Sequence, residues 1–484
     1  MKEPTLHGLD RIYNHISQHH PYPLLLYSAL CLATWAPNAY AIISINFTNA
    51  KPGFVDCNDR HGNSLTYHDF CSLVKNTTSS TECVDRQYRY VDDWINSTLV
   101  TNYDLVCERS DVIQNSKSVQ MLGFFIAAII QGIVCDKLGR RKAIVLFCTL
   151  SSVFFVLNGL AQSVSYVAFL TMQVLVITCA NASGLAQFVY GMEMLGPRYR
   201  SFFGVLAQVY FSLGFMLLTP VALLVTTSPQ IMYFGAILPL SVFAILPVMH
   251  ESFRWQLSRG MQQEGMASLR HFLAACGGKL DDIRFDAEAL IQPSIATSKI
   301  TDIFKSGRLM RYSIQLAYIW FVTTITYYAT AISESSGNLL ADNVASALVE
   351  IAFLVPGGFI LQAHWCRRRY FLATLFLISG LSALADAYFT YRELAKIAQM
   401  ARLPGRGAIT VVFAMLFVYT GEVYPTSIRA TGLGFCSFCA RVGGVLAPQM
   451  SRFMAAPWAQ GVIIATLAFT SCLVSLVLKH TSGD

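Results

Sequence analysis

The sequence has few charged residues. Asp, Glu, Lys and Arg make up 13 % of the 484 residues, whereas apolar residues make up 54 %. Soluble globular proteins carry about twice this share of charge, because a water-exposed surface must be covered with polar groups. The composition therefore excludes an ordinary soluble enzyme and indicates a membrane protein. The net charge of +7 does not indicate nucleic-acid binding, since most basic residues fall in short segments between apolar runs.

Motifs for nucleotide hydrolysis and metal chemistry are also missing. Residues 277–280 read Gly-Gly-Lys-Leu, so the phosphate-binding loop of an ATP-driven pump is absent. No His-Glu-x-x-His occurs, and no nucleophile is placed beside a base. Cys436 and Cys439 have the spacing of a metal or redox pair, but they lie in an apolar run without further ligands. We expect neither an enzyme nor a cofactor or metal.

Twelve apolar runs follow one another along the chain. A helix needs about 20 apolar residues to cross the hydrocarbon of a bilayer. We therefore predict an all-α membrane protein in which twelve transmembrane helices form two six-helix bundles, at 22–250 and 310–478. Residues 1–21 form an N-terminal segment, 251–309 a polar linker and 479–484 a short tail. The predicted spans lie near 22–46, 117–135, 143–162, 167–190, 202–225, 230–249, 312–332, 343–363, 370–389, 407–424, 431–451 and 458–478.

Basic residues in the short loops predict the orientation, because Lys and Arg concentrate on the cytoplasmic side. They follow the second, fourth, eighth and tenth spans, on the side that also holds both termini and the linker. We expect that side to be cytoplasmic and the membrane to be the plasma membrane. No cleavable signal peptide is expected, because no small-residue cleavage pattern follows the first run. Three basic residues contradict the rule, since this topology places them outside: Arg392, Lys396 and Arg402.

The long segment 47–116 has the composition of an extracellular loop. It contains four cysteines, and three glycosylation sequons lie in or next to it. Disulfides and N-linked glycans form in oxidising, extracytoplasmic compartments, which agrees with the orientation. Four cysteines allow two disulfides in three connectivities, which the sequence leaves open. The candidates are Cys57, Cys71, Cys83 and Cys107 for disulfides and Asn46, Asn76 and Asn96 for glycans.

A motif rich in glycine and charge, Gly-Ile-Val-Cys-Asp-Lys-Leu-Gly-Arg-Arg-Lys, fills residues 132–142 between the second and third spans. Gly132 would let helices approach closely, and Gly139 would permit a tight turn. Asp136 can pair with a cation or cap a helix N-terminus across the bundle, and such a lock would hold one conformer of a switching protein. A plain basic anchor loop is the alternative. The gating candidates here are Gly132, Asp136, Lys137, Gly139, Arg140 and Arg141.

The two halves repeat a Glu-x6-Arg pattern with a proline inside it. The pattern joins Glu193 to Arg200 at the end of the fourth span and Glu422 to Arg429 at the end of the tenth. Parallel repeats of this kind occur in transporters built from two similar bundles. These four residues therefore join the gating candidates.

Several segments together resemble one transporter family. The string at 132–142 resembles the loop motif of the major facilitator superfamily, and other segments are similar to its organic cation, anion and carnitine transporters. The similarity runs in family order from about residue 22 to 478, although Phe253 stands where the family usually has Pro. The resemblance implies a solute carrier that works by alternating access. The other segments that carry the resemblance are 103–107, 207–214, 251–255, 320–321, 327–328, 346–350, 419–426 and 440–444.

Two charged residues lie well inside predicted spans, away from the span ends. Arg441 lies in the middle of the eleventh, where an Arg costs about 2.5–3.5 kcal/mol, and Glu350 lies in the eighth. In the resembling family the first position commonly holds Asp in cation carriers and Arg in anion and carnitine carriers, so the resemblance implies a substrate carboxylate. With Glu350 facing the same cavity, the pair would suit a carnitine-like zwitterion, or an anion coupled to a proton on Glu350. A structural ion pair and a purely gating role of Glu350 are the alternatives.

Aromatic residues supply the predicted pocket wall. Their ring faces attract quaternary ammonium groups by about 0.5–2 kcal/mol, although packing between helices is an equal alternative. The substrate-binding candidates are therefore Arg441, Glu350, Tyr327, Tyr328, Trp320, Tyr210 and Phe211, with Trp35, Pro37 and Asn38 lining or kinking the first span.

Apolar residues recur at helical spacing in the linker, at Met266, Leu269, Phe272 and Leu273, and less clearly at Ile283 and Leu290. Amphipathic helices there would latch the halves together on the cytoplasmic face, whereas a solvated linker is the alternative.

The sequence thus predicts a transporter of small organic ions that works by alternating access. A zwitterion or organic anion is favoured over a cation, and sodium or protons are candidate coupling ions. The rival class is a non-transporting receptor or scaffold on the same fold, against which the charges inside the spans argue.

Overall fold

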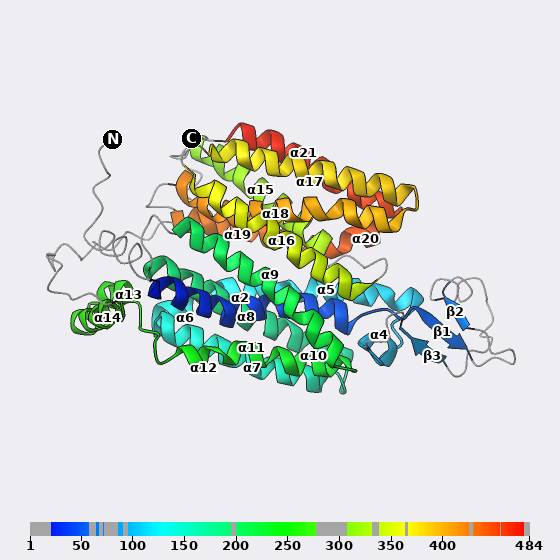
Figure 1. Ribbon diagram of the computed structural model, residues 1–484, viewed down its shortest axis with the longest axis horizontal. Helices are drawn as coiled ribbons and strands as arrows, with labels where there is room; N and C mark the ends of the chain where they lie inside the picture. Colours follow the sequence, from blue (N-terminus) through cyan, green and yellow to red (C-terminus); the bar gives the residue numbers. More distant parts are fainter. Residues whose placement is uncertain are drawn as a thin grey trace.

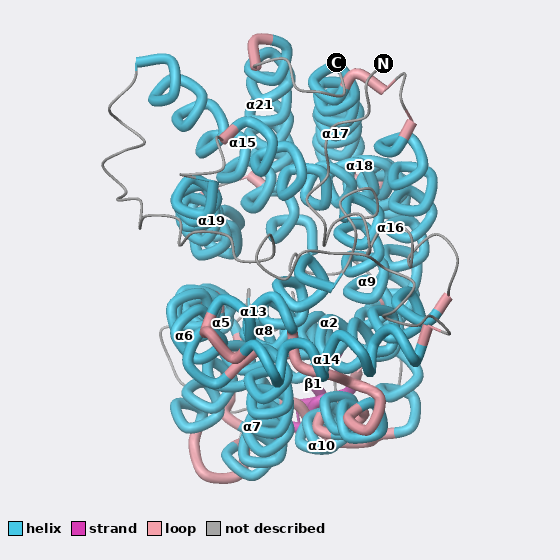
Figure 2. The backbone as a smooth tube through the Cα atoms, turned by 90° about the vertical axis from the view of Figure 1, so that its left-hand side faces the viewer, coloured by secondary structure: helices cyan, strands magenta, loops and turns pink. Residues whose placement is uncertain are grey.

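Long helices dominate the computed structural model, which describes residues 21–57, 64–66, 71, 86–90, 95–194, 200–276, 307–331, 338–363, 366–424, 429–454 and 456–478. Figure 1 shows these helices in two layers that run along the long axis of the molecule. One layer, the first half, holds the helices of residues 22–245, and the other, the second half, holds those of residues 307–476. Figure 2, which looks along that axis, shows the two halves as separate groups of helices.

Each half contains six membrane-crossing positions, some of them built from consecutive shorter helices. The first half contains α2 (Tyr22–Thr48), α5 (Asp111–Gln120) with α6 (Leu122–Leu138), α7 (Arg140–Ala161), α8 (Tyr166–Met194), α9 (Arg200–Leu224), and α10 (Ser228–Gly235) with α11 (Ile237–Leu240) and α12 (Val242–Ile245). The second half contains α15 (Gly307–Ala331), α16 (Leu339–Gln362), α17 (Arg368–Tyr391), α18 (Ala395–Val423), α19 (Arg429–Leu446) with η6 (Ala447–Gln449) and α20 (Met450–Phe453), and α21 (Pro457–Leu476).

Ten helical segments of the described chain are long and apolar enough to cross a membrane. The other two of the twelve positions are held by α15 and α19, which are more polar. A membrane helix keeps polar groups where it faces protein or an aqueous cavity rather than lipid. This is the position of both helices, because each contributes side chains to a central cavity. The predicted all-α fold of twelve helices in two six-helix bundles is thus confirmed.

One predicted helix start was wrong. We expected the tenth span to start near residue 407, but α18 begins at Ala395 and runs through Pro404. The residues before 407 are too polar to be read as a membrane segment. Several of them line a cavity in the structure instead of facing lipid, which explains how the helix tolerates them.

One end of the molecule carries the segment between the first two spans, and we call it the loop end (Figure 1). Here β1 (Phe54–Cys57) pairs antiparallel with both β2 (Ser64–Thr66) and β3 (Arg86–Arg89), beside α4 (Leu99–Asn102) and η1 (Cys107–Ser110). This small sheet was not predicted from the sequence. Cys71 and Cys107 form a disulfide, so a disulfide in this loop, as predicted, is confirmed. Cys57 lies at the end of β1, and Cys83 lies outside the described residues.

The three predicted glycosylation sites differ in their surroundings. Asn96 is exposed at the loop end, and Asn76 lies outside the described residues. Asn46 belongs to the last turns of α2, where its amide nitrogen donates to the carbonyl oxygen of Ala331 at 3.3 Å. Glycosylation at all three positions stays a prediction.

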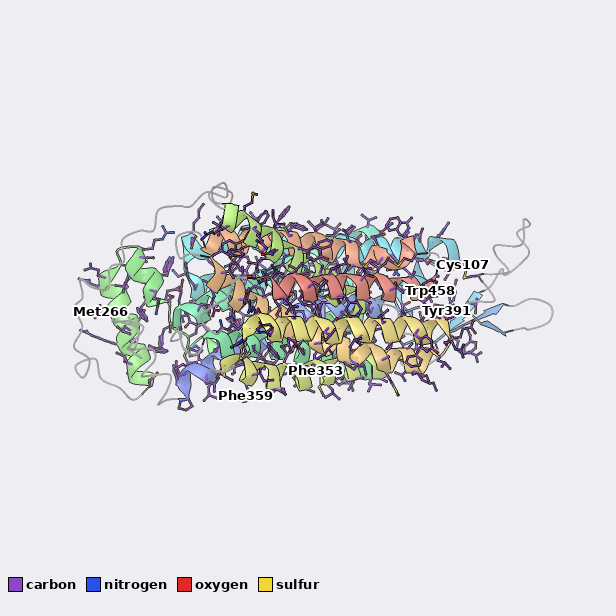
Figure 3. All side chains as sticks on the ribbon, turned by 90° about the horizontal axis from the view of Figure 1, so that it is seen from above. Cys107, Met266, Phe353, Phe359, Tyr391 and Trp458 are labelled. Carbon is purple, nitrogen blue, oxygen red and sulfur yellow. A yellow bond between two sulfur atoms is a disulfide. The ribbon has the colours of Figure 1, made fainter. Side chains whose placement is uncertain are left out.

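The opposite end, which we call the latch end, carries α13 (Phe253–Ser258) and α14 (Gln262–Ala275). Figure 3 places Met266 of α14 and Cys107 of η1 at opposite ends of the long axis. The predicted amphipathic helix is present, since Leu269, Phe272 and Leu273 of α14 are buried. The ring of Phe272 meets that of Tyr22 at a centroid distance of 6.1 Å. Ile283 and Leu290 lie outside the described residues.

Helices α2 and α9 pack so closely that one glycine position has no room for a side chain. A Cβ at Gly214 of α9 would lie 2.8 Å from the Cα of Ala36 and would overlap the carbonyl oxygen of Ala36 as well. Because both atoms belong to the backbone of α2, only a shift of a whole helix could relieve the overlap. The cavity described below is framed by this contact, since Trp35 and Asn38 lie within two residues of Ala36, and Phe211 lies three residues before Gly214.

We expect Gly214→Ala to lower the free energy of unfolding by about 1–3 kcal/mol, the usual cost of overpacking. The matched control is Gly434→Ala in α19, because a Cβ there has nothing within 4 Å. It should be neutral, or stabilising by up to about 1 kcal/mol, as for Gly to Ala in a helix. Thermal unfolding in detergent compares the two variants, and equal melting temperatures would contradict the close approach.

Candidate functional site

A small cavity lies between the two halves, lined by four polar side chains and a ring of aromatic side chains. Its volume is about 30 Å³, which has room for one or two water molecules but for no organic ion. The protein has therefore closed around this space. The lining residues are Trp35, Asn38, Phe124, Asn181, Leu185, Gln208 and Phe211 of the first half and Trp320, Tyr327, Tyr328, Phe413, Phe417 and Arg441 of the second.

Arg441 brings a guanidinium to this cavity from the middle of α19. Its ring neighbour is Phe124 of α6, whose centroid lies 4.9 Å from the guanidinium carbon. The Nε atom is buried and has no hydrogen-bond partner, and within the described part of the chain no carboxylate pairs with this side chain. A cation inside a membrane span without a counter-charge is costly. The guanidinium is therefore free to receive an anionic group from outside the protein.

Two amides face the same cavity with unused hydrogen-bonding atoms. Asn38 of α2 donates to the Oδ1 of Asn181 of α8 at 3.3 Å. This leaves the Oδ1 of Asn38 and the Nδ2 of Asn181 buried without a partner. Buried polar groups are usually satisfied, so both atoms are further candidates for contact with a ligand.

The aromatic wall comes from both halves. Trp320 donates from Nε1 to the Oγ1 of Thr420 at 2.9 Å, and its ring meets that of Phe417 at 4.8 Å. Phe417 also faces Phe188 across the halves, at 5.8 Å. Of the predicted aromatic candidates, Trp320, Tyr327, Tyr328 and Phe211 line the cavity, together with Trp35.

Tyr210 does not line this cavity. It packs beside Tyr27, Cys31 and Ala207 in a separate cluster of α2 and α9. Adjacent residues on a helix point about 100° apart, so one member of the pair Tyr210 and Phe211 turns away when the other faces the cavity. The cavity instead uses rings that the sequence did not single out: Phe124, Phe413 and Phe417.

Glu350 is engaged by groups other than Arg441. Its carboxylate is fully buried and accepts hydrogen bonds from Arg406 Nε at 2.8 Å, Ser212 Oγ at 2.6 Å and Tyr327 Oη at 3.3 Å. Arg406, which the sequence analysis did not identify, is itself buried and lies over the ring of Phe215 at 5.6 Å. Glu350 is also not among the described residues that line the cavity of Arg441. The expected cavity shared by Glu350 and Arg441 is therefore not seen.

A second and larger cavity, which we call the vestibule, lies at the loop end. Its volume is about 430 Å³. Arg406 lines it, whereas Tyr327 lines the central cavity, and Glu350 binds both side chains. The Glu350–Arg406 pair therefore forms a partition between the two cavities. The vestibule is lined by Ile43, Asn46, Phe47, Thr330, Ala331, Asn338, Leu339, Ala341, Asp342, Asn343, Ala345, Ser346, Lys396, Gln399, Met400, Arg402, Leu403 and Arg406.

Hydrogen bonds and one ion pair join the halves towards the loop end. Asn343 of α16 donates to the carbonyl oxygen of Phe215 at 2.6 Å and to the Oγ1 of Thr219 at 3.0 Å. Ser118 of α5 donates to the carbonyl oxygen of Val445 at 2.9 Å. Further contacts are Asn46 to Ala331 at 3.3 Å, Gln449 to Ser118 at 2.9 Å and the ion pair Arg452–Asp111 at 3.0 Å. These contacts hold the loop end together in this conformer.

The charged motif at 132–142 builds the latch end. Gly139 has a φ of +93°, and a Cβ there would lie 2.5 Å from the Oε2 of Glu251. The Oε1 of Glu251 accepts from the backbone nitrogens of Arg140 at 2.8 Å and Arg141 at 3.1 Å, which are the first residues of α7. A carboxylate at a helix N-terminus is stabilised by the free N–H groups and by the helix dipole. The predicted tight turn at Gly139 thus brings Glu251 against α7.

Other members of this motif behave differently from expectation. No atom of the described residues lies within 4 Å of a Cβ at Gly132, so the close helix approach expected there is absent from this conformer. Asp136 pairs with Arg140 of its own motif at 3.2 Å, and its backbone oxygen accepts from Trp255 of α13. Lys137 is exposed. Among the described residues, Asp136 thus contacts its own motif and α13.

Two equivalent ion pairs occupy the latch end of the two halves. Arg140 at the start of α7 pairs with Glu193 near the end of α8, at 2.9 Å. Arg368 at the start of α17 pairs with Glu422 near the end of α18. Each pair joins the third and fourth membrane-crossing helices of its half, which extends the predicted repeat into three dimensions. The side chains of Arg200 and Arg429 lie outside the described set.

Comparisons with known proteins agree with this architecture. A family model described as "Sugar (and other) transporter" matches residues 67–483. The organic cation transporter protein of Drosophila melanogaster is 26 % identical over 525 residues, covering 98 % of this chain and 92 % of that protein. Solute carrier family 22 member 1 of Bos taurus is 29 % identical, covering 81 % and 70 %. Organic anion transporter 3 of Sus scrofa is 26 % identical, covering 86 % and 78 %.

Solved structures show the same fold. The major facilitator superfamily proton:xylose symporter XylE, bound to 6-bromo-6-deoxy-D-glucose, has a TM-score of 0.62 at 13 % identity and covers 95 % of this chain and 97 % of its own. The inward open conformation of XylE from E. coli has a TM-score of 0.63 at 13 % identity, covering 94 % and 95 %. The chain therefore belongs to the sugar (and other) transporter family, has the fold of the major facilitator superfamily symporter XylE, and is similar in sequence to organic cation and anion transporters.

Proposed function

We propose that this protein carries small organic anions across a membrane by alternating access, without converting them chemically. The observation that carries the proposal is the guanidinium of Arg441, which faces the central cavity, has a buried Nε atom without a hydrogen-bond partner and has no counter-charge among the described residues. A substrate carboxylate would supply that charge through two parallel N–H···O bonds. The amides of Asn38 and Asn181 and the aromatic wall would hold the rest of the molecule.

A conformational cycle follows from the two cavities. The central cavity is too small for a substrate, and the Glu350–Arg406 pair separates it from the vestibule. Ser212 of the first half donates to Glu350 of the second, so a rocking motion of the halves would alter this pair. We assign a gating role to Glu350, Arg406 and Ser212, and to the charged pairs of the latch end. Sodium or protons remain the candidate coupling ions, which uptake with and without each gradient would separate.

A carnitine-like zwitterion is the second candidate substrate. The rings of Trp320, Tyr327 and Tyr328 support it, because aromatic faces attract quaternary ammonium groups. Glu350 supports it less than the sequence implied, since Arg406 already neutralises that carboxylate. An organic cation is favoured least, because no acidic residue in the described part of the chain lines the central cavity.

The proposed orientation places the latch end in the cytoplasm and the loop end outside a plasma membrane. The disulfide Cys71–Cys107 at the loop end supports it, because such bonds persist in oxidising compartments. A receptor or scaffold on the same fold is the rival function. It gives no reason for a guanidinium in the middle of the membrane.

We expect Arg441→Gln to reduce the uptake of radiolabelled hippurate, an aromatic monocarboxylate, by about 10- to 100-fold in kcat/KM. The physical reason is the loss of a charge-assisted contact that contributes about 1.5–3 kcal/mol. Uptake into one expression host, corrected for the amount of protein at the cell surface, measures the effect. Carnitine and tetraethylammonium are measured in parallel.

Arg441→Lys is the matched variant, since it keeps the positive charge but loses the planar fork of donors. It should retain part of the hippurate uptake. The proposal fails if the protein transports tetraethylammonium alone and Arg441→Ala leaves that uptake unchanged. The absence of uptake of all three compounds by the wild-type protein would favour the receptor or scaffold.

The Glu350–Arg406 pair leads to a separate prediction about stability. Arg406→Gln should lower the free energy of unfolding by about 3–5 kcal/mol, because it leaves the Glu350 carboxylate buried without a counter-charge. The double variant Glu350→Gln, Arg406→Gln should recover most of that loss, since both charges are removed together. Arg402→Gln is the control, because its pair with Asp386 is more exposed and should contribute about 1 kcal/mol or less. Thermal unfolding in detergent ranks the four proteins.

The same double variant separates the two candidate substrates. If Glu350 has only a gating role, the dissociation constants for hippurate and for carnitine should each change by less than about 3-fold. If Glu350 binds the ammonium group of a zwitterion, carnitine affinity should fall at least about 10-fold while hippurate affinity is kept. Ligand-induced shifts in melting temperature give both constants without depending on transport rate.

A further inference from the structure

We propose that the vestibule is a second binding site, which captures the carboxylate of an organic anion from the solution before the central cavity opens to it. This inference rests on the proposed function, because it concerns the same substrate class. The vestibule lies at the loop end, between the ends of α2 and α15 and the beginnings of α16 and α18. Figure 3 labels Tyr391 and Trp458 near this end, on the same side of the molecule as Cys107.

The size of the vestibule suits a small organic ion. Its volume of about 430 Å³ falls within the range of about 300–1,000 Å³ that is usual for small-molecule sites. Apolar side chains such as Phe47, Leu339 and Met400 alternate with the amides of Asn343 and Gln399 along its wall. Such a lining can hold the apolar part of a small organic ion while a few polar side chains orient the molecule. In this conformer it is also more than ten times larger than the central cavity.

Charge on one face of α18 favours an anion. Lys396, Gln399, Arg402 and Arg406 follow one another at intervals of three or four residues, so they share the face that lines the vestibule. Arg402 pairs with Asp386, and Arg406 pairs with Glu350. Neither of these carboxylates belongs to the described lining.

Lys396 differs from Arg402 and Arg406 in its lack of an observed ion pair with the described residues. Within the described ranges no ion pair or hydrogen bond is formed by its side chain, which is exposed towards the vestibule. Asp342 is the single acidic residue among the described lining residues, and Lys396 is the one cation among them without an observed carboxylate partner. Lys396 is therefore the group that would receive an incoming carboxylate.

This site also accounts for an irregularity in the sequence. Basic residues concentrate in cytoplasmic loops, yet Lys396 and Arg402 lie at the loop end, which the proposed orientation places outside. Lining an anion-binding vestibule gives both residues a reason to be there. Arg392 lies at the same end, as the residue that follows α17, but it is not among the described lining residues.

Uptake kinetics test the proposal with a matched pair of variants. Lys396→Gln should lower kcat/KM for hippurate about 3- to 10-fold, mainly through KM, because the vestibule loses its unpaired cation. The difference should shrink as the ionic strength rises from about 20 to about 300 mM, since salt screens exposed charges. Arg392→Gln removes the same charge from the same end and should leave kcat/KM within about 2-fold of the wild type. Equal losses of kcat/KM in the two variants would show that both charges act only through the general surface potential. That result would contradict a binding site in the vestibule.

Binding in detergent separates the vestibule from the central site. Arg441→Gln should remove the central site and leave weak hippurate binding. In the double variant Arg441→Gln, Lys396→Gln the affinity of this residual binding should fall by at least about 5-fold. If Arg441→Gln does not bind hippurate but binds dioleoylphosphatidylglycerol in a manner that depends on Lys396, the vestibule is a lipid headgroup site and the proposal is wrong. Full hippurate uptake by Arg441→Gln would instead contradict the proposed function, whatever Lys396→Gln does.

Discussion

A guanidinium in the middle of a membrane requires a counter-charge, and for Arg441 the described part of the protein supplies none. The other features of the central site follow from that constraint. The face of α19 that carries Arg441 cannot face lipid, so it faces a cavity, and the helix is more polar than most of the other membrane helices. The ring of Phe124 covers the guanidinium from the opposite half and provides only partial compensation. In the proposed function a substrate carboxylate supplies the missing anion, and its arrival would change the energy of the whole closed arrangement.

Arg406 shows the other solution to the same problem. It is buried in a neighbouring helix of the same half, but Glu350 neutralises it at 2.8 Å. A buried ion pair contributes little net stability, because desolvation offsets the attraction between the charges. The pair therefore suits a partition that has to open. The Glu350–Arg406 pair contacts the first half through a hydrogen bond from Ser212 and through the ring of Phe215. A shift of α9 against α16 therefore acts on the pair directly.

Much of the fold could be predicted from the sequence, whereas the pairing of the charges could not. Apolar runs specify the membrane helices because hydrocarbon tolerates few alternatives, and an isolated charge such as Arg441 is conspicuous inside such a run. Arg406 was missed because the residues before it are polar and seemed to lie outside the span. Which carboxylate meets which arginine depends on helix neighbours that periodicity does not reveal, so Glu350 was assigned to the cavity of Arg441. Tyr210 and Phe211 show a related limit, since helix phase decides which of two adjacent rings faces inward.

The distribution of strong and weak contacts indicates which parts move together. Within each half, an arginine and a glutamate join the third and fourth membrane-crossing helices, as Arg140–Glu193 and Arg368–Glu422. Charge-assisted bonds of this kind contribute about 1.5–3 kcal/mol, whereas a neutral hydrogen bond contributes about 0.5–1.5 kcal/mol. Most of the observed polar contacts between the halves near the loop end are neutral hydrogen bonds, and the ion pair Arg452–Asp111 is largely exposed. The halves are thus tied more firmly within themselves than to each other, so opening at the loop end costs less than distorting either bundle.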